Sequence, residues 1–232
     1  MMVAPQGILK PRMEILPSAQ QVLWPQLRDS IRLGFTLYGG TAIALRLGHR
    51  TSVDFDFFSS APLNRAEIDA AFPFMLRSTV LQDQANTLSV LVPRANVAAL
   101  EMSHPEPQLV KLSFFGMISF GRVAQPDITQ DEVLQVASLD DLMATKLKVI
   151  LQRAEAKDYR DIAAMVNANV DLAKGLSAAR EMFGPNFQPS ESLKAMVYFE
   201  DGDLHTLTQP EKTTLVKAVS LVRDLPVVTL LR

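Results

Sequence analysis

The chain of 232 residues contains no cysteine, only three histidines, no long apolar run and no large excess of charge of either sign. Without cysteine, a disulfide framework and a thiolate metal site are both excluded. The histidines, His49, His104 and His205, lie in separate segments, which argues against a zinc site. No apolar run approaches the ~18 residues of a membrane span, and residues 1–20 lack the apolar centre of a signal peptide. We therefore expect a cytoplasmic protein with no membrane partner.

The charge balance narrows the kinds of partner. The chain has 23 basic and 25 acidic residues, for a formal net charge of -2. A protein that coats nucleic acid through a general basic surface normally carries a basic excess. We therefore expect a polyanionic partner to bind a local basic patch and not a generally basic surface. The length suits one large domain or two small ones and allows a core without covalent staples.

The hydrophobic pattern changes along the chain from mixed to helical, which predicts an α+β protein. The predicted strands cover about residues 35–38, 52–58, 75–81, 87–92, 97–102, 110–115 and 134–137. The predicted helices cover about residues 19–33, 41–47, 64–72, 139–154, 157–168, 171–183, 190–199 and 209–224. We expect an α/β domain at 1–130, with an N-terminal arm at 1–18, and a mainly helical domain at 131–232.

A glycine pair, Gly39-Gly40, followed by Thr41, lies between a predicted strand and the start of a helix. Glycine lets a phosphate approach the backbone closely, and the free N–H groups at a helix N-terminus favour an anion. A simple tight turn is the commoner explanation of such a pair. The turn predicts a phosphate site only together with other features.

The segment Ser52–Phe58 (SVDFDFF) alternates as a strand, so Asp54 and Asp56 share one face while the hydrophobic residues between them face a core. Two carboxylates on one face repel each other unless a cation lies between them. Mg²⁺ takes oxygen ligands and also holds nucleotide phosphates. The alternative is a half-exposed strand with two solvated aspartates.

Arg50 lies between these two elements and can hold a triphosphate oxygen. A cation that follows a helix C-terminus is also favoured by the helix dipole alone. Both interpretations of Arg50 stay open.

In the second half, four charged residues align if Asp140–Met165 forms one continuous helix. Lys146, Arg153, Lys157 and Asp161 then fall within about 80° of one another. Such a stripe is usually a solvated helix edge. Facing the aspartate strand, however, it would neutralise phosphates in phosphoryl transfer, with Asp161 as a metal ligand, an orienting group for Lys146 or a general base.

Three stretches together resemble the AbiEii/AbiGii nucleotidyltransferase family of toxin components, part of the wider DNA-polymerase-β-like nucleotidyltransferase superfamily. The stretches are GGTAIALRLGHR with SVDFDFF, then VKLSFF, then ASLDDLMATK continuing to Arg153 and to KDYRDI. They span residues 39–162. The family belongs to bacterial toxin–antitoxin and abortive-infection systems.

The resemblance implies a nucleotidyltransferase-like mixed β-sheet with flanking helices, followed by a helical C-terminal domain that completes the active-site cleft. It implies transfer of a nucleoside monophosphate from an NTP to an acceptor. By position, Gly39, Gly40 and Thr41 hold the triphosphate, and Asp54 and Asp56 are catalytic and bind one or two Mg²⁺ ions. The roles implied in the second half and beside the glycine turn are catalytic for Lys146, which contacts phosphate, and Asp161, and nucleotide-binding for Arg50, Arg153, Lys157 and Asp158.

Many members of the wider superfamily have a third carboxylate on a later strand, and this sequence departs from that pattern. Ser113 occupies that position in VKLSFF, and Glu101 on the preceding predicted strand is a weak substitute. The number of metal ions therefore stays open.

The sequence predicts a Mg²⁺-dependent nucleotidyltransferase, with a tRNA 3′ end or a protein hydroxyl as acceptor and an antitoxin as partner. The alternatives are a catalytically silent NTP-binding or protein-interaction module with the same fold, and a small-molecule nucleotidyltransferase of the antibiotic-modifying kind.

Overall fold

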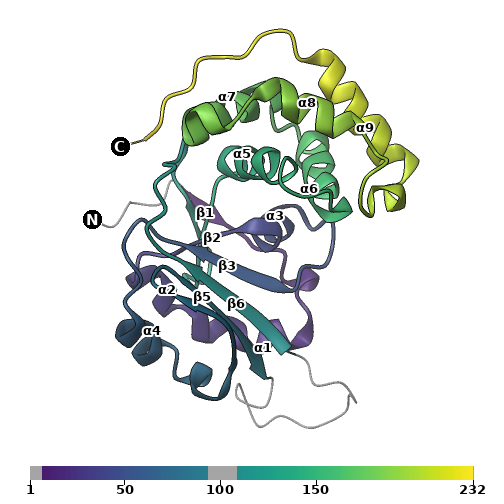
Figure 1. Ribbon diagram of the computed structural model, residues 1–232. Coiled ribbons are helices and arrows are strands. Elements are labelled where there is room, and N and C mark those ends of the chain that lie inside the picture. Colours follow the sequence, from purple (N-terminus) through teal and green to yellow (C-terminus); the bar gives the residue numbers. More distant parts are fainter. Residues whose placement is uncertain (1–6, 94–108, 232) are drawn as a thin grey trace. The chain divides into compact units, whose positions relative to one another are not determined.

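The chain forms two units and passes between them more than once. The computed structural model describes residues 7–93 and 109–231 (Figure 1). The sheet unit contains Met1–Ser119 and Pro126–Ala137, and the helical unit contains Phe120–Gln125 and Ser138–Arg232. The sequence predicted one boundary between residues 130 and 131. The chain instead returns to the sheet unit after residue 125, because the segment 126–137 supplies two of its strands.

The sheet unit is built on a mixed sheet of eight described strands in the order β1-β7-β8-β2-β3-β6-β5-β4. The strands are β1 (Ile8–Leu9), β2 (Thr36–Tyr38), β3 (Asp54–Phe58), β4 (Thr79–Gln84), β5 (Thr87–Pro93), β6 (Leu109–Phe115), β7 (Asp127–Thr129) and β8 (Gln135–Val136). At its centre, β3 pairs antiparallel with β2 and parallel with β6. The predicted mixed sheet is confirmed, and the predicted strand at 97–102 lies outside the described residues.

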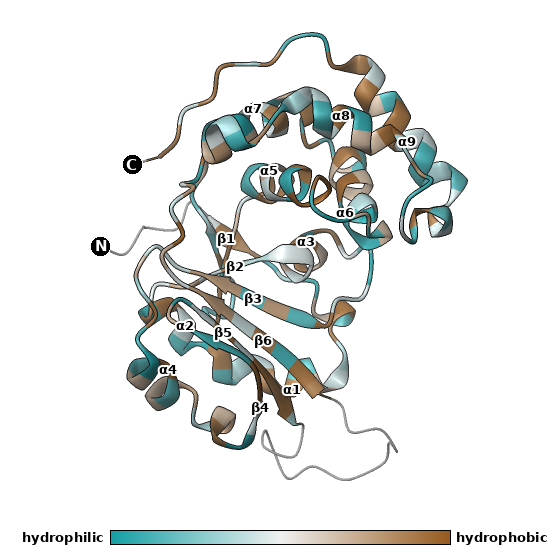
Figure 2. Ribbon diagram, in the orientation of Figure 1, coloured by the Kyte–Doolittle hydropathy of each residue, from teal (hydrophilic) through white to brown (hydrophobic). Residues whose placement is uncertain are grey.

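The two faces of the central strands differ in chemistry. Phe55, Phe57 and Phe114 are fully buried on one face, where the rings of Phe57 and Phe114 stack with centroids 5.3 Å apart. Figure 2 shows the alternation of hydrophobic and polar residues that produces this arrangement. On the opposite face lie Asp54 and Asp56, both half-buried. Burial of the aromatic face holds the aspartates in place, because a shift of one residue in register would expose the phenylalanines.

Helices cover both faces of this sheet. On the aromatic face, Trp24 lies 6.3 Å from Phe55 and Phe72 lies 5.5 Å from Phe114, measured between ring centroids. Trp24 begins η2 (Trp24–Leu27), which lies between α1 (Ser18–Leu23) and α2 (Asp29–Arg32). Phe72 lies between α4 (Arg65–Ala71) and η3 (Pro73–Arg77). Figure 1 places α3 (Gly39–Leu47) across the sheet from α1 and α4. The helix α3 therefore starts on the face that carries the aspartates.

Two local predictions in this unit were wrong in detail. The helix predicted at 19–33 is three short pieces, because Pro25 lacks an N–H group and interrupts α1. Residues 75–77, predicted as the start of a strand at 75–81, instead belong to a 3-10 turn, η3, that begins at Pro73. The arm at 1–18 contributes β1, which pairs parallel with β7 at the sheet edge.

The helical unit contains five α-helices among its described residues. They are α5 (Leu139–Val149), α6 (Ala156–Asn167), α7 (Leu172–Phe183), α8 (Pro189–Val197) and α9 (Gln209–Leu221). Side chains cap three of them: Ser138 caps α5, Asp171 caps α7, and Thr208 forms a capping box with Glu211 on α9. The helix α7 packs closely on α5 at Gly175, where a Cβ atom would lie 2.3 Å from Cγ of Met143. The predicted helical second half is confirmed.

The predicted helix at 139–154 ends early, and the continuous helix supposed over Asp140–Met165 does not form. The Oδ1 atom of Asp203 accepts a hydrogen bond of 2.6 Å from the backbone N–H of Ala156, the first residue of α6. A Cβ atom on Gly202 would lie 2.0 Å from the carbonyl oxygen of Ala154, so the two backbones are in close contact there. A contact with residues 202–203, far along the chain, therefore sets the break.

Within residues 7–93 and 109–231, no helix combines the length and the hydropathy that crossing a bilayer requires.

Candidate active site

The glycine turn predicted from the sequence joins β2 directly to α3. Tyr38 is the N-cap of α3, and its side chain does not cap the first-turn N–H groups, those of Gly39, Gly40 and Thr41. Such N–H groups, together with the helix dipole, attract an anion. The helix runs for nine residues before Gly48 ends it in the left-handed conformation.

Gly39 brings this turn against the aspartate strand. Its φ is +74°, a conformation that residues with a side chain rarely adopt. A Cβ atom at Gly39 would lie 2.6 Å from Oδ2 of Asp56, which is closer than real Cβ atoms approach an oxygen. Glycine at this position is therefore required both by the turn and by the Asp56 carboxylate.

We expect Gly39→Ala to reduce both stability and activity, because the new methyl group must displace the Asp56 carboxylate. The backbone strain alone costs about 1–3 kcal/mol. Gly34→Ala is the matched control, since Gly34 also has a φ of +74° but its Cβ atom would meet only Oγ of Ser59, at 3.8 Å. Urea unfolding should show a loss for both variants, larger for Gly39→Ala because of the added clash with Asp56, whereas the predicted nucleotidyl transfer should fall in Gly39→Ala alone. Equal activity in both would contradict the role assigned to Gly39.

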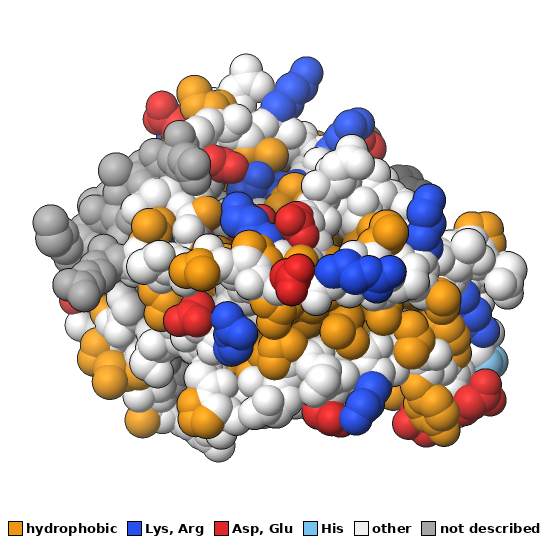
Figure 3. Space-filling model, turned by 90° about the horizontal axis from the view of Figure 1, so that it is seen from above, with side chains coloured by type: hydrophobic (Ala, Val, Ile, Leu, Met, Phe, Trp, Pro, Cys, Tyr) orange, Lys and Arg blue, Asp and Glu red, His pale blue; other side chains and the backbone are white. Residues whose placement is uncertain are grey.

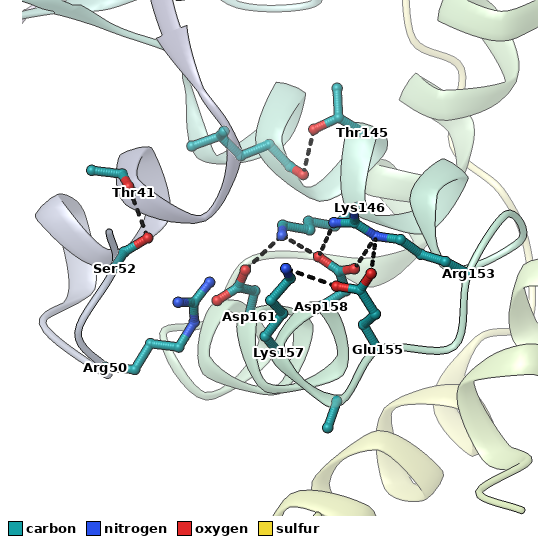
Figure 4. A network of polar contacts seen from close by, with 12 residues as sticks. Thr41, Arg50, Ser52, Thr145, Lys146, Arg153, Glu155, Lys157, Asp158 and Asp161 are labelled. Carbon is teal, nitrogen blue, oxygen red and sulfur yellow. Dashed lines mark hydrogen bonds and ion pairs between the residues drawn. The ribbon is translucent and has the colours of Figure 1, made fainter. Parts of the chain in front are cut away.

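Thr41 is buried and fastens the start of α3 to β3. Its Oγ1 atom donates to the backbone carbonyl oxygen of Asp54 and lies 2.7 Å from Oγ of Ser52 (Figure 4). Thr41 as a whole is 1% exposed, and its hydroxyl is committed to these contacts within the sheet unit. Ser52, which the sequence did not single out, holds the other end of this contact.

The face of the sheet that carries Asp54 and Asp56 continues onto β6. In the parallel register, Asp54 is paired with Lys111 and Asp56 with Ser113, and paired residues on neighbouring strands share a face. Ser113 is buried and its Oγ lies 3.1 Å from Oγ of Ser89 on β5. The position expected for a third carboxylate thus holds a pair of bonded hydroxyl groups, and Glu101 lies outside the described residues.

The two aspartates fit a hard divalent cation by their chemistry. Both are carboxylates on one face of a strand, and Gly39 leaves room beside Asp56. Elsewhere in the described chain, as here, no group of three or more His, Asp or Glu side chains converges on one point. The protein thus offers two carboxylate ligands from β3 for a metal.

In the helical unit, the predicted charged residues form a buried ion network across the break between α5 and α6. Nζ of Lys146 lies 2.5 Å from Oδ1 of Asp158 and 2.7 Å from Oδ2 of Asp161 (Figure 4). Nε of Arg153 lies 2.9 Å from Oδ2 of Asp158. Both carboxylates are fully buried, and the side chain of Lys146 is 7% exposed. Because burial of an unpaired charge is costly, these four residues stabilise one another as a set.

The break between the helices brings this network together. The prediction of a single helix had aligned Lys146, Arg153 and Asp161 with Lys157 and had left Asp158 out of the stripe. Two of the three N–H donors of Lys146 are directed to Asp158 and Asp161. Lys157, by contrast, is half-exposed and pairs with Glu155 at 2.7 Å. Arg50 lies in the sheet unit, where its Nη1 atom donates to the carbonyl oxygen of Thr51 at 3.0 Å.

Two buried ionisable groups in the helical unit have shifted pKa values. Burial raises the pKa of Asp141, although hydrogen bonds from the Val123 N–H and the Ser138 hydroxyl oppose the shift. Burial raises the pKa of Tyr159 to about 12, with further contributions from the charges of Asp201 and Asp158. Tyr159 is therefore a neutral hydrogen-bond donor, and its hydroxyl donates to the carbonyl oxygen of Ala195 at 3.2 Å.

The raised pKa of Asp141 predicts a pH dependence of stability. The folded state binds the Asp141 proton more tightly than the unfolded state does, so this group stabilises the fold at low pH and loses that contribution as the pH rises above about 4. Compared with Asp141→Asn, the wild type should lose stability as the pH rises, with a slope of at most about 1.4 kcal/mol per pH unit. Urea unfolding of both proteins between pH 4 and 7 measures the difference, and a difference that does not change with pH would contradict the prediction.

Comparisons with known proteins agree with the fold. The structure is similar to MenT4, a nucleotidyltransferase toxin from Mycobacterium tuberculosis H37Rv, with a TM-score of 0.58 and 14% identity over 88% of this chain and 82% of that one. It is also similar to a crystal structure of a protein from H. pylori assigned to the nucleotidyltransferases, with a TM-score of 0.55 and 18% identity over 88% and 91% of the two chains. The fold is therefore that of nucleotidyltransferases.

The family follows from the sequence comparisons. Residues 27–219 match the family described as nucleotidyl transferase AbiEii toxin of type IV toxin–antitoxin systems. An uncharacterised protein of Aquifex aeolicus strain VF5 is 28% identical over 169 residues, which cover 72% of this chain and 74% of that protein. The chain belongs to the AbiEii nucleotidyltransferase toxin family, and the resemblance inferred from the sequence motifs is confirmed.

Proposed function

We propose that this nucleotidyltransferase moves a nucleoside monophosphate from an NTP to an acceptor hydroxyl, with Mg²⁺ as cofactor. The observation that carries the proposal is the joint position of Asp54, Asp56 and the start of α3. The Asp56 carboxylate lies where a side chain on Gly39 would otherwise be, beside a helix start that the side chain of its N-cap residue, Tyr38, does not cap. A site with anion donors next to paired carboxylates matches the needs of a metal–triphosphate substrate.

The roles of the residues follow from this placement. The backbone N–H groups of Gly39, Gly40 and Thr41 bind phosphate oxygens. Asp54 and Asp56 hold the metal, and Thr41 with Ser52 keeps α3 and β3 in a fixed relation. A Mg²⁺ ion bound by the two carboxylates would neutralise charge on the triphosphate and on the leaving pyrophosphate.

For the helical unit we propose an orienting role for the buried network. The geometry favours Lys146 and Arg153 as groups that fix Asp158 and Asp161, because each makes short ion pairs with a fully buried carboxylate. Lys157 and Arg50 are more exposed and remain candidates for contact with the nucleotide.

The acceptor proposed is a tRNA 3′ end or a protein hydroxyl, and an antitoxin is the proposed partner, in keeping with the toxin family. On the face drawn in Figure 3, basic and acidic side chains are interspersed among hydrophobic ones. That pattern gives no support to a broad electrostatic footprint on this face. It is compatible with an enzyme that touches one end of an RNA or one protein loop.

The test is transfer of label from each of the four α-labelled NTPs to total RNA, total protein and small-molecule extracts, with Mg²⁺ and with EDTA. Labelled RNA or protein that requires Mg²⁺ is the expected result. Labelled small molecules alone would favour the antibiotic-modifying alternative. Tight NTP binding without labelled product in any extract would favour the silent binding module and overturn the proposal.

A further inference from the structure

One cation lies within the aspartate face of the sheet and has no part in the roles assigned so far. Lys111 on β6 is paired in parallel register with Asp54 on β3, and on its other side it is paired with Leu91 on β5. Neighbouring strands are about 4.8 Å apart, and paired residues share a face. Lys111 therefore stands beside Asp54, on the same surface as Asp56 and Ser113.

Lys111 is not used by the fold as far as the described residues show. It is half-buried, and none of the carboxylates or carbonyl oxygens in residues 7–93 and 109–231 forms an ion pair or hydrogen bond with it. Lys146 differs from Lys111, because its ammonium group forms ion pairs with two buried carboxylates. A half-buried lysine with no partner among the described residues has lost part of its hydration, and a ligand phosphate can restore the lost interactions.

The neighbouring residues explain why a cation suits this place. Ser113 and Ser89 form a neutral hydroxyl pair where a further carboxylate would add negative charge. The face thus carries two carboxylates and one ammonium group. A single divalent cation on Asp54 and Asp56 leaves this surface with a net positive charge, which favours a polyphosphate.

We propose that Lys111 binds a phosphate oxygen of the NTP and supplies, beside Asp54, positive charge that complements one metal ion. This inference rests on the proposed function and deepens it, because it names a phosphate contact in the same site. In the protein without nucleotide, the positive charge of Lys111 beside Asp54 opposes the binding of a divalent cation there.

The experiment measures two equilibria on the full chain with Lys111→Met, which keeps the apolar stem and removes the charge. The first is the affinity for non-hydrolysable NTP analogues in Mg²⁺, and the second is the affinity for Mn²⁺ alone, by calorimetry or electron paramagnetic resonance. We expect nucleotide binding to weaken by about tenfold or more, whereas Mn²⁺ binding stays equal or becomes tighter. Lys111→Arg should lie between the wild type and Lys111→Met for the nucleotide.

The matched control is Lys10→Met, because Lys10 is an exposed lysine of the same unit and should leave both affinities unchanged. Nucleotide affinity of Lys111→Met equal to that of the wild type would overturn the role of Lys111 and leave the proposed function standing. A parallel loss of Mn²⁺ and nucleotide binding would also overturn it, since that pattern indicates a structural role. A wild type that binds no NTP would refute the proposed function itself.

Discussion

Asp56→Asn is expected to reduce nucleotidyl transfer by at least about a thousandfold, which corresponds to roughly 4 kcal/mol of transition-state stabilisation. Asparagine has nearly the same shape as aspartate, but it lacks the negative charge that holds a divalent cation. The carboxylate lies next to Gly39 at the start of α3, so the lost charge is the one nearest to the proposed triphosphate. In cells whose growth is arrested by expression of the wild type, expression of Asp56→Asn should accordingly cause no growth arrest.

The control for this variant is Asp69→Asn, because Asp69 is an exposed aspartate on α4 of the same unit. Both variants should unfold in urea within about 1 kcal/mol of the wild type. Mn²⁺ binding should fall in Asp56→Asn and stay unchanged in Asp69→Asn. Transfer at the wild-type rate by Asp56→Asn would remove Asp56 from the site and with it the basis of the proposed function.

The part of the site that could be predicted from the sequence depends on local regularities. A strand alternates with a period of two, so the aromatic residues of SVDFDFF placed Asp54 and Asp56 together on the other face. A glycine pair before an apolar helix predicted the turn at Gly39, whose φ of +74° bears out the need for glycine. Such features need no knowledge of distant contacts.

The remaining part depends on contacts between segments far apart in the sequence. The register that pairs Lys111 with Asp54 joins residues 57 positions apart, and the sequence of this strand, VKLSFF, does not by itself show which residue of another strand lies beside Lys111. An alternation of Lys111 and Ser113 along that strand was the available signal for Lys111. The break between α5 and α6 depends on Asp203, so a helical period alone could not predict it, and the ion network across the break was missed with it.

Lys146→Met is expected to destabilise the protein by about 3–5 kcal/mol, because it removes the ammonium group that the buried carboxylates of Asp158 and Asp161 share. The cost arises from the lost ion pairs of the two buried carboxylates, since methionine fills nearly the same volume as the lysine stem. Unfolding in urea followed by far-ultraviolet circular dichroism measures the loss. The second variant, Lys146→Met with Asp161→Asn, should recover a large part of it, because the Arg153–Asp158 pair then remains balanced.

Lys174→Met is the matched control on the same unit. Lys174 pairs with Asp140 at 2.6 Å, but its side chain is 47% exposed, so removing this pair should cost no more than about 1 kcal/mol. If Lys146→Met costs no more than Lys174→Met, the network does not hold α5 and α6 together. A variant that keeps its stability and loses transfer would then place Lys146 in direct contact with the nucleotide. We therefore expect Lys174→Met to be more stable than Lys146→Met. An exposed ion pair contributes little to stability, whereas removing one partner from a buried ion pair is costly because the remaining carboxylate is not solvated.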